Sequence, residues 1–244
     1  MALYLNDKTS NGNNLTNNNA ATEVTSSLPF AQSTSAVGLA SASSQYLSAA
    51  DSASLDLSTT GTIEFWIKFT STPTAGNAFT VVAKDNQSTQ RSYAVFFRNS
   101  GGTLRWEGIV FNGANVDYYS WNHAASTGTW YHIALTLDTT QASATTFELF
   151  INGSSQGNGS AITSDNIATI TNSTASLTIG ASGVPSEYVN GNMDEVRIWN
   201  TVRTSTQIAN FRSVELTGSE SGLVAYYPFE SFLGGSNAIF FNQL

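Results

Sequence analysis

Thr62-Ile63-Glu64-Phe65-Trp66-Ile67-Lys68-Phe69 is the stretch that points most directly to the fold of this 244-residue chain. An apolar residue occupies every second position from Ile63 to Phe69, and Glu64 and Lys68 fall between them. Successive side chains of a β-strand point to opposite faces, so this spacing predicts a strand that buries one face.

Further apolar stretches of strand length follow at short spacing along the chain. Turn dipeptides such as Asn112-Gly113 and Asn152-Gly153 come directly after two of them. Many short strands with turns between them are typical of a β-sandwich or jelly roll. The further strands are expected at residues 79–84, 92–98, 103–111, 116–121, 130–138, 146–151, 176–180, 192–199 and 222–229.

One segment departs from the strand pattern. Thr204 and Gln207 have the spacing of a helix capping box, and apolar residues follow them, which predicts a short helix near residues 204–212. The prediction is therefore an all-β protein, a two-sheet antiparallel β-sandwich with one short helix. Because no repeat of solenoid or propeller period is present, we expect one domain over residues 1–244.

The composition excludes several classes of function. The formal net charge is -8, with only 9 basic residues, which argues against a nucleic-acid partner. No apolar run approaches the ~20 residues that a membrane helix needs, so no membrane insertion is expected. The chain has no cysteine, which excludes disulfides and thiolate chemistry.

The two ends of the sequence carry expectations about location and partners. Residues 1–7 lack the basic and apolar regions of a signal peptide, so an extracellular or virion-surface location would be reached by another route, such as assembly into a particle. The C-terminal extension, residues 231–244, contains Ile239, Phe240 and Phe241. These three residues are expected to close the sandwich or to dock on a protein subunit, which includes the alternative of a homo-oligomer.

Seven segments in order resemble the laminin-G-like, concanavalin A-like lectin/glucanase family of bacterial and viral surface proteins. The resemblance covers residues 7–230 and implies two antiparallel sheets. Its most specific motif is "GNMDEVRIWNTVRTST" at residues 191–206. The other segments are 6–14, 62–69 ("TIEFWIKF"), 129–134 ("TWYHIA"), 147–153 ("FELFING"), 177–180 ("LTIG") and 222–230 ("GLVAYYPFE").

Catalytic residues are not expected. Relatives that hydrolyse β-glucans carry paired carboxylates facing one cleft, and no E-x-D-x-E run occurs here. Asp194 and Glu195 are adjacent, so on a regular strand they would point to opposite faces. Glu195 and Arg197 are expected to form a solvated pair. The only histidines are His123 and His132, and no G-x-S-x-G motif is present.

The family resemblance implies one Ca²⁺ ion at the rim of the sandwich. Asp194 matches the family's ligand position, and oxygens of Asp7, Asn11 and Asn14 in the N-terminal loop are further candidates. Asp194 would share its face with core residues, where an uncompensated carboxylate is costly and an oxygen-bound cation would compensate it. The alternative is that Asp194 caps a turn through backbone N–H groups.

The richest cluster for a sugar ligand lies in residues 116–123. Aromatic rings stack on sugar C–H groups beside amide and carboxylate hydrogen-bonding groups. The alternative is that these aromatic residues fill the space between the sheets, which is the expectation for Trp66 and Trp106. The candidate glycan-binding residues are Asp117, Tyr118, Tyr119, Trp121, Asn122 and His123.

The sequence thus predicts a non-catalytic carbohydrate-binding or adhesion module displayed on a surface or particle. The alternative is a structural or decoration protein of a virion that binds mainly protein partners. A glycoside hydrolase is the third and least favoured hypothesis, because the sequence lacks the paired carboxylates on one strand that such an enzyme needs.

Overall fold

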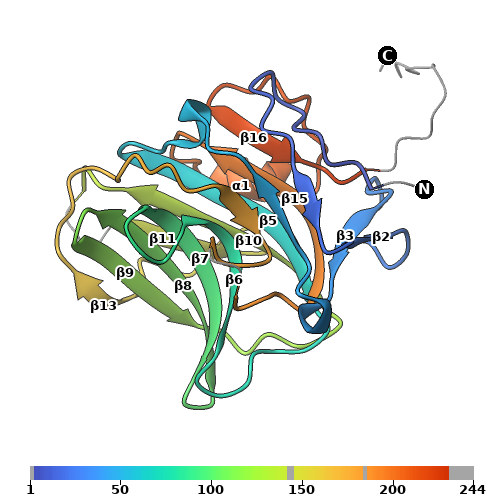
Figure 1. Cartoon of the computed structure of the whole chain (residues 1–244), viewed down its shortest axis with the longest axis horizontal. Helices are drawn as coiled ribbons and strands as arrows, with labels where there is room; N and C mark the ends of the chain where they lie inside the picture. Colours follow the sequence, from blue (N-terminus) through green and yellow to red (C-terminus); the bar gives the residue numbers. More distant parts are fainter. Residues whose placement is uncertain (1–2, 142–145, 184–185, 231–244) are drawn as a thin grey trace.

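Two antiparallel sheets packed face to face make up the computed structural model, which describes residues 3–141, 146–183 and 186–230 (Figure 1). Sheet A has the order β1-β4-β14-β6-β7-β8-β9-β13. Its strands are β1 (Thr16–Asn18), β4 (Tyr46–Ala49), β14 (Leu177–Ile179), β6 (Ala78–Asp85), β7 (Arg91–Ser100), β8 (Thr103–Asn112), β9 (Asn115–Asn122) and β13 (Ser160–Ser164).

Sheet B has the order β12-β11-β10-β5-β15-β3-β2, and β16 also pairs with β15. Its strands are β12 (Ser154–Ser155), β11 (Phe147–Ile151), β10 (Trp130–Asp138), β5 (Thr60–Phe69), β15 (Gly191–Trp199), β3 (Ala36–Leu39), β2 (Thr22–Val24) and β16 (Leu223–Tyr227). Two single turns of 3₁₀ helix, Ser41–Ser43 and Ala53–Leu55, and the helix α1 (Ser205–Phe211) complete the described elements.

The predicted fold class is confirmed. Each predicted strand has a counterpart that begins and ends within a few residues of the expected position, as 130–138 and 192–199 show. The short strands β1, β2, β12 and β13 were not predicted, because their sequences are short, mostly polar and lack alternation. No helix in the described part of the chain is long and apolar enough to cross a membrane.

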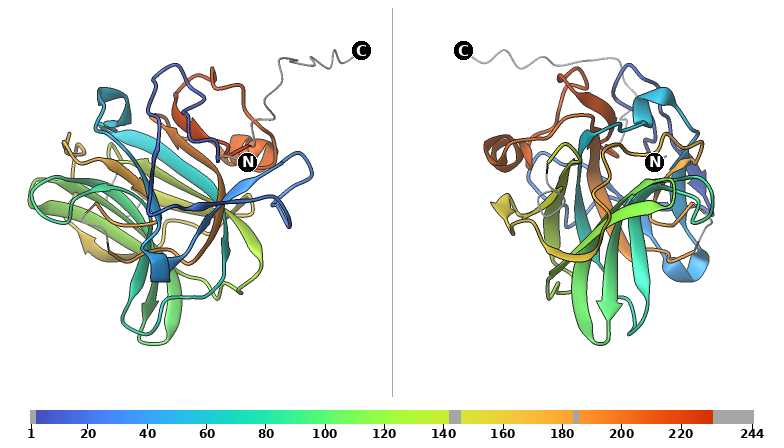
Figure 2. Two further views of the ribbon diagram at one scale, coloured as in Figure 1. Left: turned by 45° about the vertical axis from the view of Figure 1, so that its right-hand side comes forward. Right: turned by 90° about the vertical axis from the view of Figure 1, so that its left-hand side faces the viewer.

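The core lies between the inner faces of the two sheets. Ile63, Phe65, Ile67 and Phe69 are at most 1% exposed, as their alternation predicts. Phe69 stacks on Phe97 of sheet A with ring centroids 4.6 Å apart. Trp106 is buried in the same layer, so its predicted packing role is confirmed. Strands β7, β8 and β9 lie side by side and form a continuous face (Figure 2, right).

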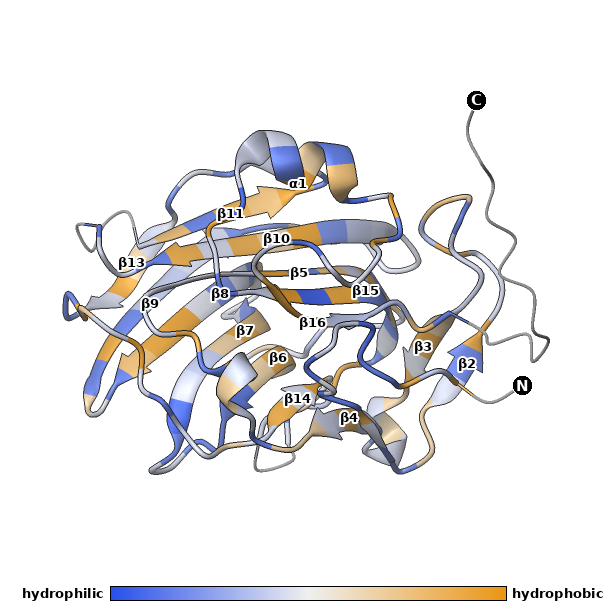
Figure 3. Ribbon diagram, turned by 90° about the horizontal axis from the view of Figure 1, so that it is seen from above, coloured by the Kyte–Doolittle hydropathy of each residue, from blue (hydrophilic) through white to orange (hydrophobic). Residues whose placement is uncertain are grey.

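The outer face of sheet B is covered, and this overturns one expectation. Helix α1 lies over β10 and β11, where Ile208 packs against Ala134 and Phe150 (Figure 3). Glu195 and Arg197 are 1% and 0% exposed under this cover, so the solvated pair predicted from sequence is wrong. Strand alternation places both side chains on the outer face, but it does not show that residues 200–222 cover that face.

A β-bulge in β15 overturns a second expectation. The pairing with β5 shifts register between Asp194, opposite Trp66, and Arg197, opposite Glu64. Glu195 adopts a left-handed backbone conformation with φ 52°. An extra residue in one strand disrupts the alternation of side chains. Asp194 and Glu195 therefore do not separate to opposite faces, and Asp194 lies across from outer-face Trp66 rather than beside the core residues.

Candidate functional site

Strand β9 divides the predicted glycan cluster between its two faces. Tyr119 is 1% exposed and packs against Phe147 in the core. Asp117 is fully buried, and its carboxylate accepts hydrogen bonds from the backbone N–H groups of residues 165–167 at 2.9 to 3.3 Å. These contacts close the loop after β13. Neither Asp117 nor Tyr119 is therefore presented to a ligand.

Trp121, Asn122 and His123 of the predicted cluster line a hollow at one end of β8 and β9, and Tyr118 does not. Its volume is about 570 Å³, and its wall combines β8, β9 and the segment 156–160. A second hollow of about 360 Å³ shares Asn122 and continues to His123 at the same end of the strands. We call the two together the β8–β9 hollow. The first part is lined by Arg105, Ser120, Trp121, Asn122, Gln156, Gly159 and Ser160.

Polar groups dominate the first part of the β8–β9 hollow. Trp121 is 6% exposed, and its indole N–H donates to the Gly157 carbonyl at 2.8 Å, which fixes the segment that follows β12 against the strand. A Cβ on Gly159 would lie 2.5 Å from the Trp121 ring, so only glycine fits there in that conformation, with φ +73°. The amides of Asn122 and Gln156 face the same hollow. Amide groups both donate and accept hydrogen bonds, as sugar hydroxyls require.

His123 extends the polar wall. Its Nδ1 accepts a hydrogen bond from the Trp106 indole N–H at 3.2 Å, and its ring meets Tyr131 edge-on at 5.0 Å. Partial burial lowers the pKa of His123, which favours the neutral ring. A neutral ring that accepts at Nδ1 carries its proton on Nε2, so it is a hydrogen-bond donor there.

An ion-pair network on the outer face of sheet A borders the hollow. Glu107 is fully buried and accepts from Arg98 Nε at 2.9 Å and from Arg105 Nε at 2.6 Å. The Tyr118 hydroxyl donates to the same carboxylate. Burial and this carboxylate raise the pKa of Tyr118 to about 12. The Tyr118 hydroxyl is thus occupied within the protein, and Tyr118 is not among the residues that line the hollow.

Ser120 and Gln156 were missed by the sequence analysis. Arg105 lies directly opposite Asn122 in the antiparallel pair β8–β9. The hairpin turn Asn112-Gly113 and the length of the two strands carry the signal for this pairing. Gln156 and the segment up to Ser160 carried no such signal, because their polar sequence does not predict a position against β9.

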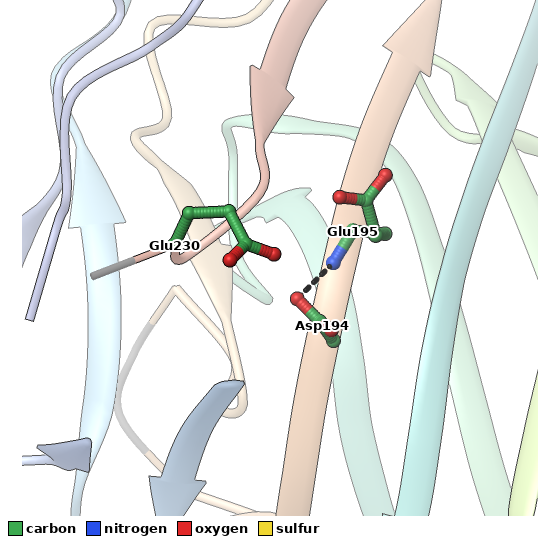
Figure 4. A group of neighbouring side chains, drawn as sticks. All are labelled: Asp194, Glu195 and Glu230. Carbon is green, nitrogen blue, oxygen red and sulfur yellow. Dashed lines mark hydrogen bonds between the residues drawn. The ribbon is translucent and has the colours of Figure 1, made fainter. Parts of the chain in front are cut away.

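The acidic residues form a second group at the rim of the sandwich. One carboxylate oxygen each of Asp194, Glu195 and Glu230 lies within 4.8 Å of the others. Figure 4 shows the carboxylates of Asp194 and Glu230 turned toward each other. Asp194 accepts from the Ser33 hydroxyl at 2.7 Å and from the Glu195 backbone N–H at 2.8 Å. Thr34 donates its backbone N–H to Glu230 at 2.7 Å.

Burial dominates the electrostatics of this acidic group. It raises the pKa of Asp194 well above its ordinary value, and the neighbouring Glu195 charge raises it further. Burial also raises the pKa of Glu230. No cationic side chain contacts Asp194 or Glu230 among the described residues. A bound divalent cation would compensate such carboxylates, and hard oxygen donors are the ligands that Ca²⁺ prefers.

The N-terminal loop makes its contacts away from the acidic group. The Asp7 carboxylate accepts from the backbone N–H groups of Thr9, Asn13 and Tyr226 at 2.9 to 3.0 Å. Asn14 accepts from the Asp7 backbone N–H, and Asn11 donates to the Val224 carbonyl. The structure therefore does not bring Asp7, Asn11 or Asn14 into the acidic group. The Asp7 carboxylate and the Asn11 amide instead hold the loop to β16, and Asn14 bonds within the loop.

The predicted docking residues Ile239, Phe240 and Phe241 lie outside the described residues. Their role in closing the sandwich or docking on a protein subunit stays a prediction.

Comparisons with solved structures agree with the fold. A candidate carbohydrate-binding protein from Bacteroides ovatus has a TM-score of 0.59 and 17% identity, over 81% of this chain and 52% of that chain. Domain 4 of an extracellular arabinanase from Geobacillus stearothermophilus, solved with arabinotriose, has a TM-score of 0.52 and 18% identity, over 87% of both chains. The binding domain of Paraclostridial Mosquitocidal Protein 1 has a TM-score of 0.60 and 15% identity, over 86% of this chain and 51% of that chain.

This chain thus spans about half the length of the first and third of these proteins. No curated protein sequence matches it. A sequence profile of one superfamily does match, over residues 41–209, which include the strands β5 to β11, β15 and most of α1. The chain belongs to the concanavalin A-like lectin/glucanase superfamily.

Proposed function

We propose that this protein is a non-catalytic carbohydrate-binding module that holds its ligand in the β8–β9 hollow. The observation that carries the proposal is the convergence of Arg105, Asn122 and Gln156 on one polar hollow beside Trp121 and His123. A few convergent polar groups in a concave site are what a sugar-binding site needs for orientation and specificity. The hollow is large enough, at about 570 Å³ in its main part, for a small oligosaccharide.

Two of the similar structures support a carbohydrate ligand. One is described as a candidate carbohydrate-binding protein, and the other is an arabinanase domain solved with arabinotriose. The residues that line the hollow include no aspartate or glutamate. Glycoside hydrolysis uses a pair of carboxyl groups flanking the scissile bond, so the lining fits binding better than hydrolysis. Display on a surface or particle, adhesion and protein partners stay predictions from sequence.

Substitution of Asn122 provides the test. We expect Asn122→Ala to weaken glycan binding roughly three- to tenfold, because one or two neutral hydrogen bonds are lost. The measurement is retardation of the purified protein in native gels that contain one of a panel of polysaccharides, arabinan included. Asn115→Ala is the matched control, since Asn115 is exposed at the other end of β9, roughly 24 Å away along the strand.

The control variant should bind like the unchanged protein. If no polysaccharide retards the unchanged protein, with or without Ca²⁺, the proposal fails. If Asn122→Ala and Asn115→Ala bind equally well, the site lies elsewhere on the molecule.

We also propose that Ca²⁺ binds at the acidic group of Asp194 and Glu230. Support comes from the buried Asp194 carboxylate and the half-buried Glu230 carboxylate, which face each other without a cationic partner among the described residues, and from the Ser33 hydroxyl that donates to Asp194. Carboxylate and hydroxyl oxygens fit a hard cation. The ion would tie β15 to the chain after β16 and to the segment 33–35. Its role would therefore be to hold the rim of the sandwich.

Calcium should raise the thermal stability of the protein. A ligand that binds only the folded state stabilises it by about 2.7 kcal/mol at a concentration one hundred times its Kd. We expect the melting temperature to rise with added CaCl₂ and to fall with EDTA, and Asp194→Asn to abolish the response. Glu148→Gln, a change at a half-buried position on β11 outside the acidic group, is the control that should keep it. An unchanged melting temperature in millimolar CaCl₂ would rule out this site.

A further inference from the structure

Two arginines lie side by side on neighbouring strands of sheet A, at the edge of the β8–β9 hollow. Arg98 of β7 and Arg105 of β8 are directly paired in the register of the two strands. Like charges in such a pair repel, so their side-by-side placement needs compensation. The fully buried Glu107 carboxylate supplies it, because one oxygen accepts from each guanidinium. Two positive charges and one negative charge leave a local excess of one positive charge.

The Glu107 carboxylate orients Arg105. It is fully buried and binds Arg98, Arg105 and the Tyr118 hydroxyl, so it has no freedom to turn away. It holds Arg105 only through Nε, and the terminal nitrogens of that guanidinium have no hydrogen-bond partner among the described residues. The Arg105 side chain is 22% exposed and lines the hollow. A guanidinium fixed at Nε presents its terminal nitrogens as a planar fork.

A planar fork of two N–H donors matches the two oxygens of a carboxylate. The rest of the wall, with Asn122 and Gln156, offers neutral groups suited to sugar hydroxyls. The protein as a whole has a formal net charge of -8, which repels anions. A cationic group in this one hollow is therefore a local feature that favours an anionic ligand against the overall charge.

We propose that the sugar bound in the β8–β9 hollow carries a carboxylate, as uronic and sialic acids do, and that Arg105 binds that carboxylate. This inference rests on the proposed function, since it specifies the ligand of the same hollow. Arg105 sets the preference for the charged sugar, while Asn122 and Gln156 contact its neutral hydroxyls.

Two matched pairs of glycans test the inference. One pair contains a uronic acid and the other a sialic acid, so together they show which kind of acidic sugar binds. The first pair is polygalacturonate and its fully methyl-esterified form, and the second is 3′-sialyllactose and lactose. In calorimetric titrations at low salt, the charged member of one pair should bind at least roughly tenfold more tightly than its neutral partner. Because the contact is charged and partly exposed, raising NaCl should weaken it.

Arg105→Gln should remove the preference, because it should weaken the binding of the charged member much more than that of the neutral member. Arg91→Gln is the matched control, since it removes the same charge from an arginine that stacks on Phe111 and pairs with Asp85 away from the hollow. Arg105→Lys keeps the charge without the fork and should lose most of the preference. Melting temperatures of the three variants establish that they remain folded.

The outcomes separate this inference from the proposed function. If charged and neutral members of both pairs bind equally, or if Arg105→Gln keeps the preference, the carboxylate assignment is wrong while the carbohydrate-binding function stands. If none of these glycans binds but a neutral polysaccharide such as arabinan does, the carboxylate assignment again fails alone. If no glycan of any kind binds, both proposals fail.

Discussion

Glu64 is a buried carboxylate on the covered outer face of sheet B, where it contacts a tryptophan, an arginine and a histidine. Its carboxylate accepts from the Trp199 indole N–H at 2.8 Å and lies 3.6 Å from Arg197 and 3.4 Å from His132. Burial alone would raise the pKa of Glu64, but His132 and the charge of Arg197 together lower it to about 2. A buried charge of this kind is tolerated only when it is paired and hydrogen-bonded. Glu64 is therefore a structural residue, although it is titratable and buried beside a histidine.

The low pKa of Glu64 makes its contribution to stability depend on pH. A carboxyl whose pKa is lower in the folded than in the unfolded state stabilises the fold above the unfolded value, near 4.5, and loses that contribution as the pH falls toward 2. We expect Glu64→Gln to lower the free energy of unfolding at pH 7, and this deficit to shrink as the pH falls from 5 to 3. Urea unfolding of both proteins across this range measures it.

Glu148→Gln, a change at a half-buried position on the same sheet outside the buried network, should show no such pH dependence. A deficit of the Glu64→Gln variant that stays constant from pH 7 to pH 3 would contradict the interpretation of the buried network.

Among the elements, helix α1 has an effect larger than its seven residues suggest. Its N-terminus is closed by a capping box, in which Thr204 Oγ1 accepts from the Gln207 N–H at 3.2 Å and the Gln207 side chain accepts from the Thr204 N–H at 2.9 Å. At its other end the Phe211 carbonyl accepts from the buried Arg197 at 2.9 Å. The helix thus covers sheet B and satisfies a charge beneath it.

Removing the cap should loosen this cover. We expect Thr204→Ala to lower the free energy of unfolding by about 1 kcal/mol, the usual effect of losing an N-cap side chain. Ser205→Ala is the matched control, because Ser205 is the exposed neighbour and its side chain makes no hydrogen bond among the described residues. Chemical unfolding of the two variants measures the difference. Equal stabilities would show that the capping box does not hold the helix.

At the scale of the whole molecule, the two sheets use their outer faces differently. The outer face of sheet B is buried beneath α1 and residues 200–222, where Arg197 pairs with Glu64 and Glu195. The outer face of sheet A carries the Arg98–Glu107–Arg105 network and ends in the β8–β9 hollow. The fold therefore leaves sheet A, rather than sheet B, to present polar groups to a ligand.

The candidate site was predictable in part. Residues 116–123 were recognised as a cluster because their residue types are those of sugar sites, and Trp121, Asn122 and His123 do line the β8–β9 hollow, whereas Asp117 and Tyr119 are buried. Arg105 and Gln156 come from separate segments, and only the pairing of β8 with β9 and the Trp121–Gly157 hydrogen bond bring them there. Residue type thus identified the part of the site that is local in sequence.

By itself the sequence determined the strands, the single helix and the superfamily, because strand alternation, turn dipeptides and the capping box are local patterns. Only the tertiary structure decided which sheet face is covered and that a β-bulge changes the side-chain directions of Asp194 and Glu195. It also decided which residues of β8, β9 and the segment 156–160 come together around the hollow. Alternation divides side chains between two faces, but it does not state what packs on either face. That depends on contacts between residues far apart in the chain, such as Ile208 with Ala134.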